Sequence, residues 1–179
     1  MTSPLRRLLV CGIGNPGKAY AFTRHSIGIL AVDGIQKTWR FPEFEKLGDY
    51  GQVSQGHDAS LFKSTVFMNC SGKAVSKAQN KFSDHCLIVL HDELELAPGL
   101  VKLRKSGQPR GHNGLRSIIS TIGNEFYRIG IGIGRPESRD SQNVSDYVLN
   151  GLSSAEVRIL HEDAVPSILD IIDGLKQEL

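Results

Sequence analysis

Near its start the chain carries the stretch Gly12-Ile13-Gly14-Asn15-Pro16-Gly17, which runs on through Tyr20 to His25. The apolar residues 8–10 precede it and predict a short buried strand. The segment 27–39 that follows spaces its apolar residues with the period of a helix. In an open α/β sheet, ligands bind where such a strand ends. We therefore expect this turn to form part of a functional site, in which Asn15 offers a donor and an acceptor.

The rest of the chain alternates between strand and helix patterns. In order, it predicts a hairpin of strands at 50–54 and 60–65, a helix at 71–82 capped by Ser71, a buried strand at 86–90, a strand at 101–104, a helix at 115–122, a strand at 127–133, a polar loop at 137–143 and a last helix opened by a capping box at Ser153 and Glu156. This alternation predicts a single α/β domain over residues 1–179, with a mixed, twisted β-sheet flanked by helices on both faces.

The composition is that of an ordinary globular protein, with 40% hydrophobic and 22% charged residues. No apolar run approaches the roughly 18 residues that a membrane span requires. Three cysteines, Cys11, Cys70 and Cys86, lie far apart, which favours free thiols in a reducing compartment over a disulfide or a catalytic thiol. The basic start, Met1 to Arg7, is too short for an organelle-targeting segment, and we expect a protein that is not secreted.

The glycines of the opening stretch also match G-x-G-x-x-G, the fingerprint of dinucleotide-binding proteins. That motif requires a βαβ unit, whereas here the first helix leads into a hairpin. Pro16 also removes a backbone N–H from the loop that would hold a pyrophosphate. An NAD-dependent oxidoreductase is therefore a weak alternative.

A histidine and an aspartate suggest a general base. His25 stands at a helix entry, and Asp92 follows the apolar strand 86–90. If the two meet, the carboxylate holds one ring nitrogen and leaves the other free to take a proton from water. A structural histidine and a turn-capping aspartate are the plain alternatives. A metal site formed with His91 and His112 is a weaker one, because no pair has the i, i+4 spacing of a zinc helix.

Three asparagines, Asn15, Asn69 and Asn113, stand at junctions from loop to helix. Each one alone is a common helix cap. Together at one sheet edge they would form a row of neutral donors suited to a carbonyl group and its developing oxyanion.

A basic segment lies near the same loops. Fifteen positions of the chain contain five cations and no acid: Lys102, Arg104, Lys105, Arg110 and Arg116. A solvated face and a phosphate-binding patch are both open interpretations. Tyr20 and Phe67 add aromatic surface, although core packing is the plainer role for Phe67.

These blocks, taken in order, resemble the bacterial-type peptidyl-tRNA hydrolases. The resemblance covers nearly the whole chain and rests on Gly12-x-Gly14-Asn15-Pro16-Gly17-x-x-Tyr20-x-x-Thr23-Arg24-His25, Phe67-Met68-Asn69-x-Ser71-Gly72, His91-Asp92-Glu93-Leu94, Arg110-Gly111-His112-Asn113-Gly114-Leu115 and Gly130-Ile131-Gly132-Ile133-Gly134-Arg135-Pro136.

The resemblance implies an enzyme of translation that recycles tRNA by hydrolysing the ester between peptide and tRNA, without metal or cofactor. It implies His25 as the base, Asp92 as its holder and Asn15 as the residue that helps distinguish peptidyl from free aminoacyl esters. Contacts to the substrate, the peptide and the tRNA acceptor stem, fall to Tyr20, Phe67, Met68, Asn69 and Asn113, with the basic residues Lys102, Arg104 and Arg110 beside them. A monomer without membrane attachment is expected, in the cytoplasm or alternatively in the mitochondrion, since Arg110 and Arg135 resemble eukaryotic members.

The chain departs from the family pattern at three places. Ser26 replaces an expected asparagine, which weakens a hydrogen bond at the helix entry. Gln108-Pro109 replaces a glycine-rich run, which makes the loop before Arg110 stiffer. Gly130 stands where some relatives carry a basic residue, so that tRNA affinity relies more on Lys102, Arg104 and Arg128. A non-catalytic RNA-binding domain of the same fold is the rival hypothesis.

Overall fold

The structure, a computed structural model, describes residues 6–179, and most of the basic start Met1 to Arg7 lies outside them. Its elements, in chain order, are β1 Arg7–Gly12, the 3₁₀ turn η1 Arg24–Ser26, α1 Ile27–Trp39, β2 Glu45–Leu47, β3 Gly51–Gln55, β4 Ala59–Ser64, the 3₁₀ turn η2 Met68–Cys70, α2 Ser71–Lys81, β5 His85–Glu93, β6 Val101–Arg104, α3 Asn113–Ile122, β7 Tyr127–Gly132, α4 Ser141–Leu149, α5 Ser154–Ile159, a π-helical turn Leu160–Ala164 and α6 Val165–Glu178.

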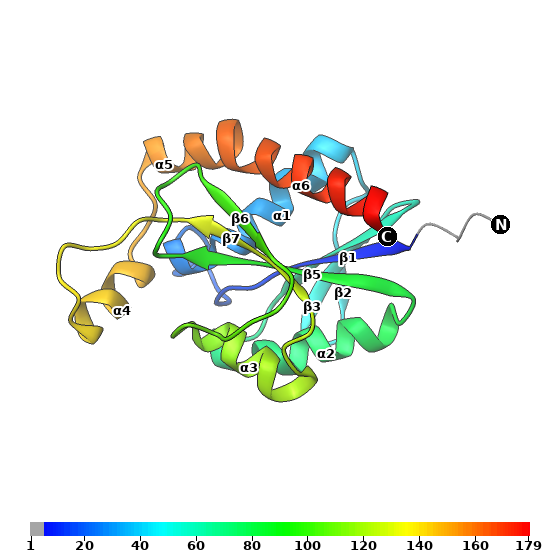
Figure 1. Cartoon of the computed structure of the whole chain (residues 1–179), viewed down its shortest axis with the longest axis horizontal. Coiled ribbons are helices and arrows are strands. Elements are labelled where there is room, and N and C mark those ends of the chain that lie inside the picture. Colours follow the sequence, from blue (N-terminus) through cyan, green and yellow to red (C-terminus); the bar gives the residue numbers. More distant parts are fainter. Residues whose placement is uncertain (1–5) are drawn as a thin grey trace.

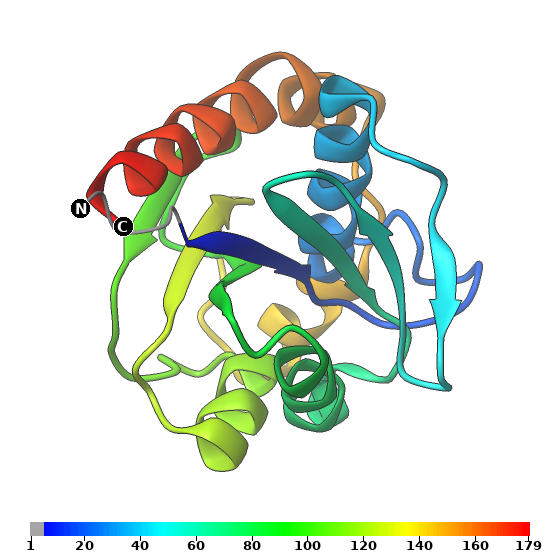
Figure 2. The same ribbon diagram turned by 90° about the vertical axis from the view of Figure 1, so that its right-hand side faces the viewer.

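One seven-stranded sheet runs through the described part of the chain, in the order β2-β3-β4-β1-β5-β7-β6. The four inner strands, β4, β1, β5 and β7, are parallel, and β2, β3 and β6 add antiparallel pairs at the two sides. Helices α1, α5 and α6 cover one face and α2 and α3 cover the other (Figures 1 and 2). The expected fold, a mixed sheet flanked by helices on both faces, is confirmed.

The sheet separates two hydrophobic cores, because successive side chains of a strand point to opposite faces. Leu8 and Val10 of β1 join the core under α1 and α6. Leu9 and Cys11 join the core under α2 and α3. The inner strands are therefore covered on both faces, which explains why β5 reads as a continuous apolar run.

Several local predictions need correction. Segment 137–143, expected as a loop, contains the start of α4, whose N-cap is Asp140. Cys70 rather than Ser71 is the N-cap of α2, and the Ser71 hydroxyl instead donates to the carbonyl of Met68. The capping box at Ser153 and Glu156 is confirmed.

The parallel strands all end at one edge of the sheet, and the loops that follow them meet there. His25 and Asn15 follow β1, Asn69 follows β4, and Asp92 lies at the end of β5. Helix α4 lies beyond this same edge (Figure 1). None of the helices in residues 6–179 has the length and apolarity to span a bilayer.

Candidate active site

A cleft of about 540 Å³ opens at the carboxyl edge of β5. It extends from the end of that strand, past the loop between β6 and α3, to the inner side of α4. Of the residues predicted from the sequence, it is lined by His25, Asp92, Arg104, Arg110 and Asn113. The cleft therefore contains the predicted base, its carboxylate and two of the predicted cations.

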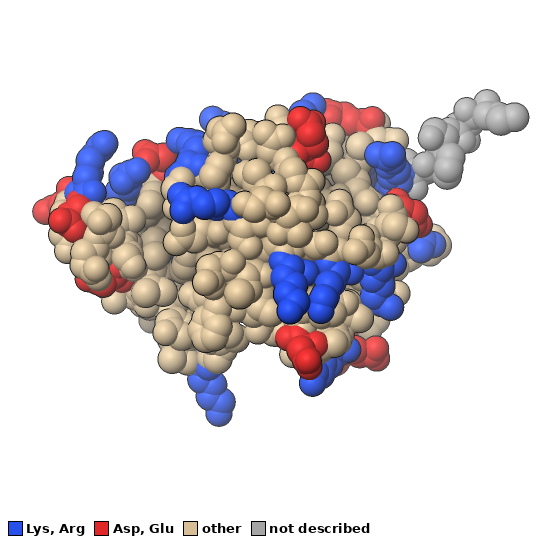
Figure 3. Space-filling view, turned by 90° about the horizontal axis from the view of Figure 1, so that it is seen from below, with Lys and Arg blue, Asp and Glu red and all other residues tan. Residues whose placement is uncertain are grey.

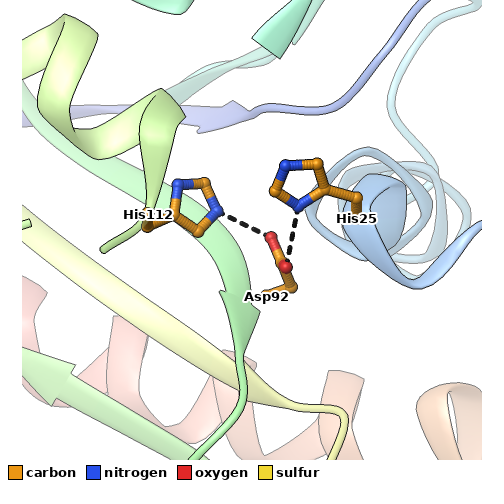
Figure 4. Close-up of side chains that lie close together, drawn as sticks. All are labelled: His25, Asp92 and His112. Carbon is orange, nitrogen blue, oxygen red and sulfur yellow. Dashed lines mark hydrogen bonds and ion pairs between the residues drawn. The ribbon is translucent and has the colours of Figure 1, made fainter. Parts of the chain in front are cut away.

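Asp92 binds two histidines rather than one. Its Oδ2 lies 2.8 Å from Nδ1 of His25, and its Oδ1 lies 2.7 Å from Nε2 of His112. The three side chains come from different elements: the turn before α1, the end of β5 and the residue before α3 (Figure 4). The predicted His25–Asp92 pair is thus formed, and His112 occupies the second carboxylate oxygen.

The hydrogen bonds assign the ring protons. His112 is the N-cap of α3, and its Nδ1 accepts from the backbone N–H of Leu115 at 3.2 Å. Its ring proton therefore lies on Nε2 and is donated to Asp92. An ionised carboxylate only accepts, so His25 donates to it from Nδ1. Nε2 of His25 then carries a free lone pair on the side of the ring away from Asp92, where a general base needs it.

Burial and charge act in opposite directions on this pair. Burial of His25 disfavours its charged form, but the charge and hydrogen bond of Asp92 outweigh burial and raise the pKa of His25. Burial favours the neutral form of Asp92, yet the interactions with His112 and His25 dominate and hold the pKa of the carboxyl well below its usual range. The carboxylate therefore stays ionised while it holds the two rings.

His91 plays a different part in the cleft wall. It is 3% exposed, and its Nδ1 donates to the carbonyl of Asp92 at 2.8 Å. Burial first, and then the neighbouring His112, lower the pKa of His91 to about 3. Its ring meets that of His112 edge to face, with centroids 5.3 Å apart. His91 is thus a neutral side chain packed behind His112.

Asn15 is held by two neighbours. Its Oδ1 accepts from the backbone N–H of Met68 at 2.8 Å, and its own N–H donates to Oγ of Ser26 at 3.2 Å. The carboxamide NH₂ of Asn15 has no hydrogen-bond partner among the described residues. Ser26 is buried and its side chain makes no cap hydrogen bond to α1. Its hydroxyl instead joins the turn of His25 to the loop of Asn15.

The other predicted substrate contacts differ in accessibility. Phe67 is 57% exposed, and Asn69 and Lys102 are exposed too. Tyr20 is half-buried. Met68 is 5% exposed and packs in the core under α2 and α3, so its side chain offers little surface to a ligand.

The cations at the cleft are paired with acids. Arg104 binds Glu93 at 3.0 Å, and Arg110 lies 3.5 Å from the same carboxylate. The expectation that Arg128 supports tRNA affinity is wrong. Arg128 is fully buried, and its guanidinium donates to the carbonyls of Gly107, Asn124 and Phe126.

Two parts of the site are not predicted from the sequence. The sequence suggests His112 only as a metal ligand, although this residue directly precedes Asn113 in the matched block. The apolar side of α4, with Val144, Val148 and Leu149, lines the far end of the cleft. The signal for it was the apolar spacing that begins at Val144, just after the segment expected as a loop.

The three side chains at the centre are also the kind that bind metals. The ligand atoms of His25, Asp92 and His112 lie within 4.8 Å of one another. However, both facing nitrogens are already bonded to the carboxylate. A cation here would have to displace both ring protons.

Comparison with known proteins decides the family. The family model described as peptidyl-tRNA hydrolase matches residues 9–178. The chain belongs to the peptidyl-tRNA hydrolase family. A peptidyl-tRNA hydrolase of Wolbachia sp. subsp. Brugia malayi is 43% identical over 172 residues, covering 93% of this chain and 90% of that protein. A probable peptidyl-tRNA hydrolase of Schizosaccharomyces pombe is 40% identical over 177 residues, covering 94% of this chain and 82% of the yeast protein.

The fold agrees with a solved member of the peptidyl-tRNA hydrolase family. The crystal structure of the enzyme from Acinetobacter baumannii superimposes with a TM-score of 0.86 at 32% identity, covering 99% of this chain and 92% of that one. The family and the fold class expected from the sequence are therefore both confirmed.

Proposed function

We propose that this protein hydrolyses the ester that joins a peptide to tRNA, with His25 as general base held by Asp92. The enzymatic activity follows from membership of the peptidyl-tRNA hydrolase family. The observation that supports the residue roles is the hydrogen bond between Nδ1 of His25 and Asp92, since it leaves Nε2 of His25 free to accept a proton.

In this mechanism a water molecule donates a proton to Nε2 of His25 while its oxygen attacks the ester carbonyl. The imidazolium that forms is stabilised by the adjacent carboxylate of Asp92, which remains ionised. The proton then passes to the ribose oxygen as the ester bond breaks, so that the peptide carboxylic acid and a tRNA with an intact terminal ribose are formed. The acid loses its remaining proton to solvent and leaves as a carboxylate. The base is regenerated in the same step.

Neutral amide groups stabilise the tetrahedral oxyanion. Asn15 presents its NH₂ group because its Oδ1 is occupied by Met68. The Oδ1 of Asn113 is likewise occupied, by the guanidinium of Arg116 at 3.2 Å. Both amides are thereby oriented as donors, which is the polarity that a developing oxyanion requires.

The character of the side chains along the cleft indicates where the peptide and the tRNA end of the substrate lie. The peptide lies against the apolar residues of α4 that line the cleft. Phe67, Tyr20 and Asn69, which are not among the lining residues, add contacts to the substrate outside it. Lys102, Arg104 and Arg110 contact the phosphates of the acceptor end. We expect the protein to act as a monomer, without a metal or cofactor, in the cytoplasm or alternatively in the mitochondrion.

The decisive experiment compares two esters of the same tRNA in the presence of a chelator. We expect release of the blocked amino acid from N-acetylaminoacyl-tRNA and no release from the unblocked aminoacyl-tRNA. Binding of tRNA without hydrolysis of either ester would support the rival, an RNA-binding domain. Activity that disappears with the chelator and returns with zinc would contradict a metal-independent reaction.

A further inference from the structure

Helix α2 carries a row of lysines that leads away from the cleft. Lys73, Lys77 and Lys81 follow one another at intervals of four residues, and all three are exposed. Residues four apart lie on the same side of a helix, about 6 Å from one another along its axis. The three ammonium groups therefore form one line on the surface of α2.

The topology gives this line a direction. Helix α2 begins directly after the turn η2, whose Met68 is bonded to Asn15 at the site. It ends before His85, where β5 starts at the opposite edge of the sheet. The row thus starts beside the candidate active site and runs down the face of the molecule.

The two helices on this face carry only positive charges. Helices α2 and α3 contain no acid, and none of their four cations, Lys73, Lys77, Lys81 and Arg116, forms an ion pair among the described residues. Figure 3 looks onto this face and shows basic side chains gathered there, with acidic side chains at the margin of the group. In contrast, Arg104 and Arg110 inside the cleft share the carboxylate of Glu93.

The opposite face has the reverse charge. Segment 153–179, which contains α5 and α6, carries six acids and only two lysines or arginines. Although the net charge is only +2, the charges are therefore separated, with basic residues on the α2 side of the sheet and acidic residues on the α6 side. A polyanion that approaches this protein is attracted to the α2 face and repelled from the α6 face.

We infer that the lysine row of α2 binds the phosphate backbone of the double-stranded acceptor arm of the same tRNA whose ester lies in the cleft. This inference rests on the proposed function and names a surface outside the cleft. Double-helical RNA is held mainly by its shape and its phosphates, for which a row of unpaired lysines on a rigid helix is suited. The packing of α2 makes it rigid, because Gly72 lies so close to α3 that an added Cβ would stand 2.2 Å from the carbonyl oxygen of Ser117.

The test uses two substrates that share the ester and differ in the arm. One is N-acetylaminoacyl-tRNA, and the other is the same ester on the trinucleotide CCA, which has no double helix. In the triple variant Lys73→Gln, Lys77→Gln, Lys81→Gln, we expect KM for the tRNA ester to rise roughly tenfold at low salt, with kcat unchanged. The slope of log(kcat/KM) for the tRNA ester against log salt concentration should be less negative than that of the wild type by roughly two to three, about one for each lysine. Cleavage of the CCA ester should not change.

The control removes three cations from the other face through Lys37→Gln, Arg40→Gln and Arg158→Gln, all exposed and without ion pairs among the described residues. It lowers the net charge equally, and we expect it to leave KM nearly unchanged. If both triple variants raised KM for the tRNA ester equally, the lysines of α2 would act only through the net charge of the protein, and the inference would be overturned. An unchanged KM in the α2 variant would overturn it too. If the wild type cleaved neither the CCA ester nor the tRNA ester, the proposed function itself would be contradicted.

Discussion

The carboxylate of Asp92 accepts from two imidazoles, so the charge that raises the pKa of His25 is shared with His112. This arrangement fixes the ring of His25 from one side and limits how strongly the carboxylate attracts its proton. A base must be neutral to accept a proton from water. The pH dependence of the reaction therefore reports this hydrogen bond directly.

The first prediction concerns Asp92→Asn. In the wild type the raised pKa of His25 means that kcat/KM falls as the pH drops through a midpoint above the ordinary histidine value of about 6.5. The amide removes the charge that favours the imidazolium and leaves burial, which disfavours it. We expect the midpoint to move below about 6.5 and the plateau rate to fall by roughly 10²–10⁴. A profile with an unmoved midpoint would contradict the role of Asp92.

The second prediction separates the two bonds of His112. Asparagine is a good N-cap but is too short to reach Asp92 while it caps α3. His112→Asn should therefore keep the cap but leave one oxygen of the buried Asp92 carboxylate without its partner. We expect it to lower the free energy of unfolding by about 1–3 kcal/mol and to lower kcat roughly tenfold. His112→Ala should show the same kcat and be less stable than His112→Asn by about a further 1 kcal/mol, because it also loses the cap. Urea unfolding and steady-state kinetics of both variants test this, and a wild-type kcat in His112→Asn would remove His112 from the site.

At the scale of elements, the position of His25 depends on how closely α1 approaches the sheet. A Cβ on Gly28 would stand 2.2 Å from the carbonyl oxygen of Leu90 in β5. Gly12 of β1 faces Gly28 in turn, since its own Cβ would stand 2.4 Å from the carbonyl oxygen of that residue. The two glycines let α1 lie against β1 and against β5, the strand that carries Asp92.

The third prediction compares two alanine substitutions in helices. Gly28→Ala should cost about 3 kcal/mol or more, because the backbone of β5 cannot move away as a flexible side chain can. It should also lower kcat, since His25 stands three residues before Gly28. Gly174 of α6 has no heavy atom within 4 Å of an added Cβ. Gly174→Ala should therefore stabilise the protein by about 0.5–1 kcal/mol, as alanine does in an open helix position. Effects of the same sign in thermal and urea unfolding would contradict this account of the packing.

Elements with strong apolar patterns were predictable, and those without them were not. The continuous apolar run predicts β5, although the strand His85–Glu93 extends beyond the predicted residues 86–90 at both ends. Helix α4 has no buried residue, so its first turn looked like a polar loop. The buried Arg128 could not be foreseen from its charge, because its cost of burial is offset by carbonyl acceptors that only the folded backbone brings together.

At the scale of the whole molecule, the sheet decides which parts of the site the sequence can indicate. Residues that follow parallel strands converge at one edge, so His25, Asn15 and Asp92 could be grouped from the order of strands alone. The role of His112 depends on where α3 starts relative to β5, which no local pattern gives. The separation of charge between the α2 and α6 faces was hidden as well, because it depends on which helix covers which face.

The most direct test of the account is the turnover of N-acetylaminoacyl-tRNA by His25→Ala, measured together with the affinity for uncleaved tRNA. In the proposed mechanism the free Nε2 of His25 accepts the proton, so we expect kcat to fall by roughly 10²–10⁴ or more. Affinity for tRNA should stay within about twofold of the wild type, since the lost ring carries no phosphate contact in this account. Turnover at the wild-type rate in His25→Ala, in a folded protein that still binds tRNA, would contradict the central claim.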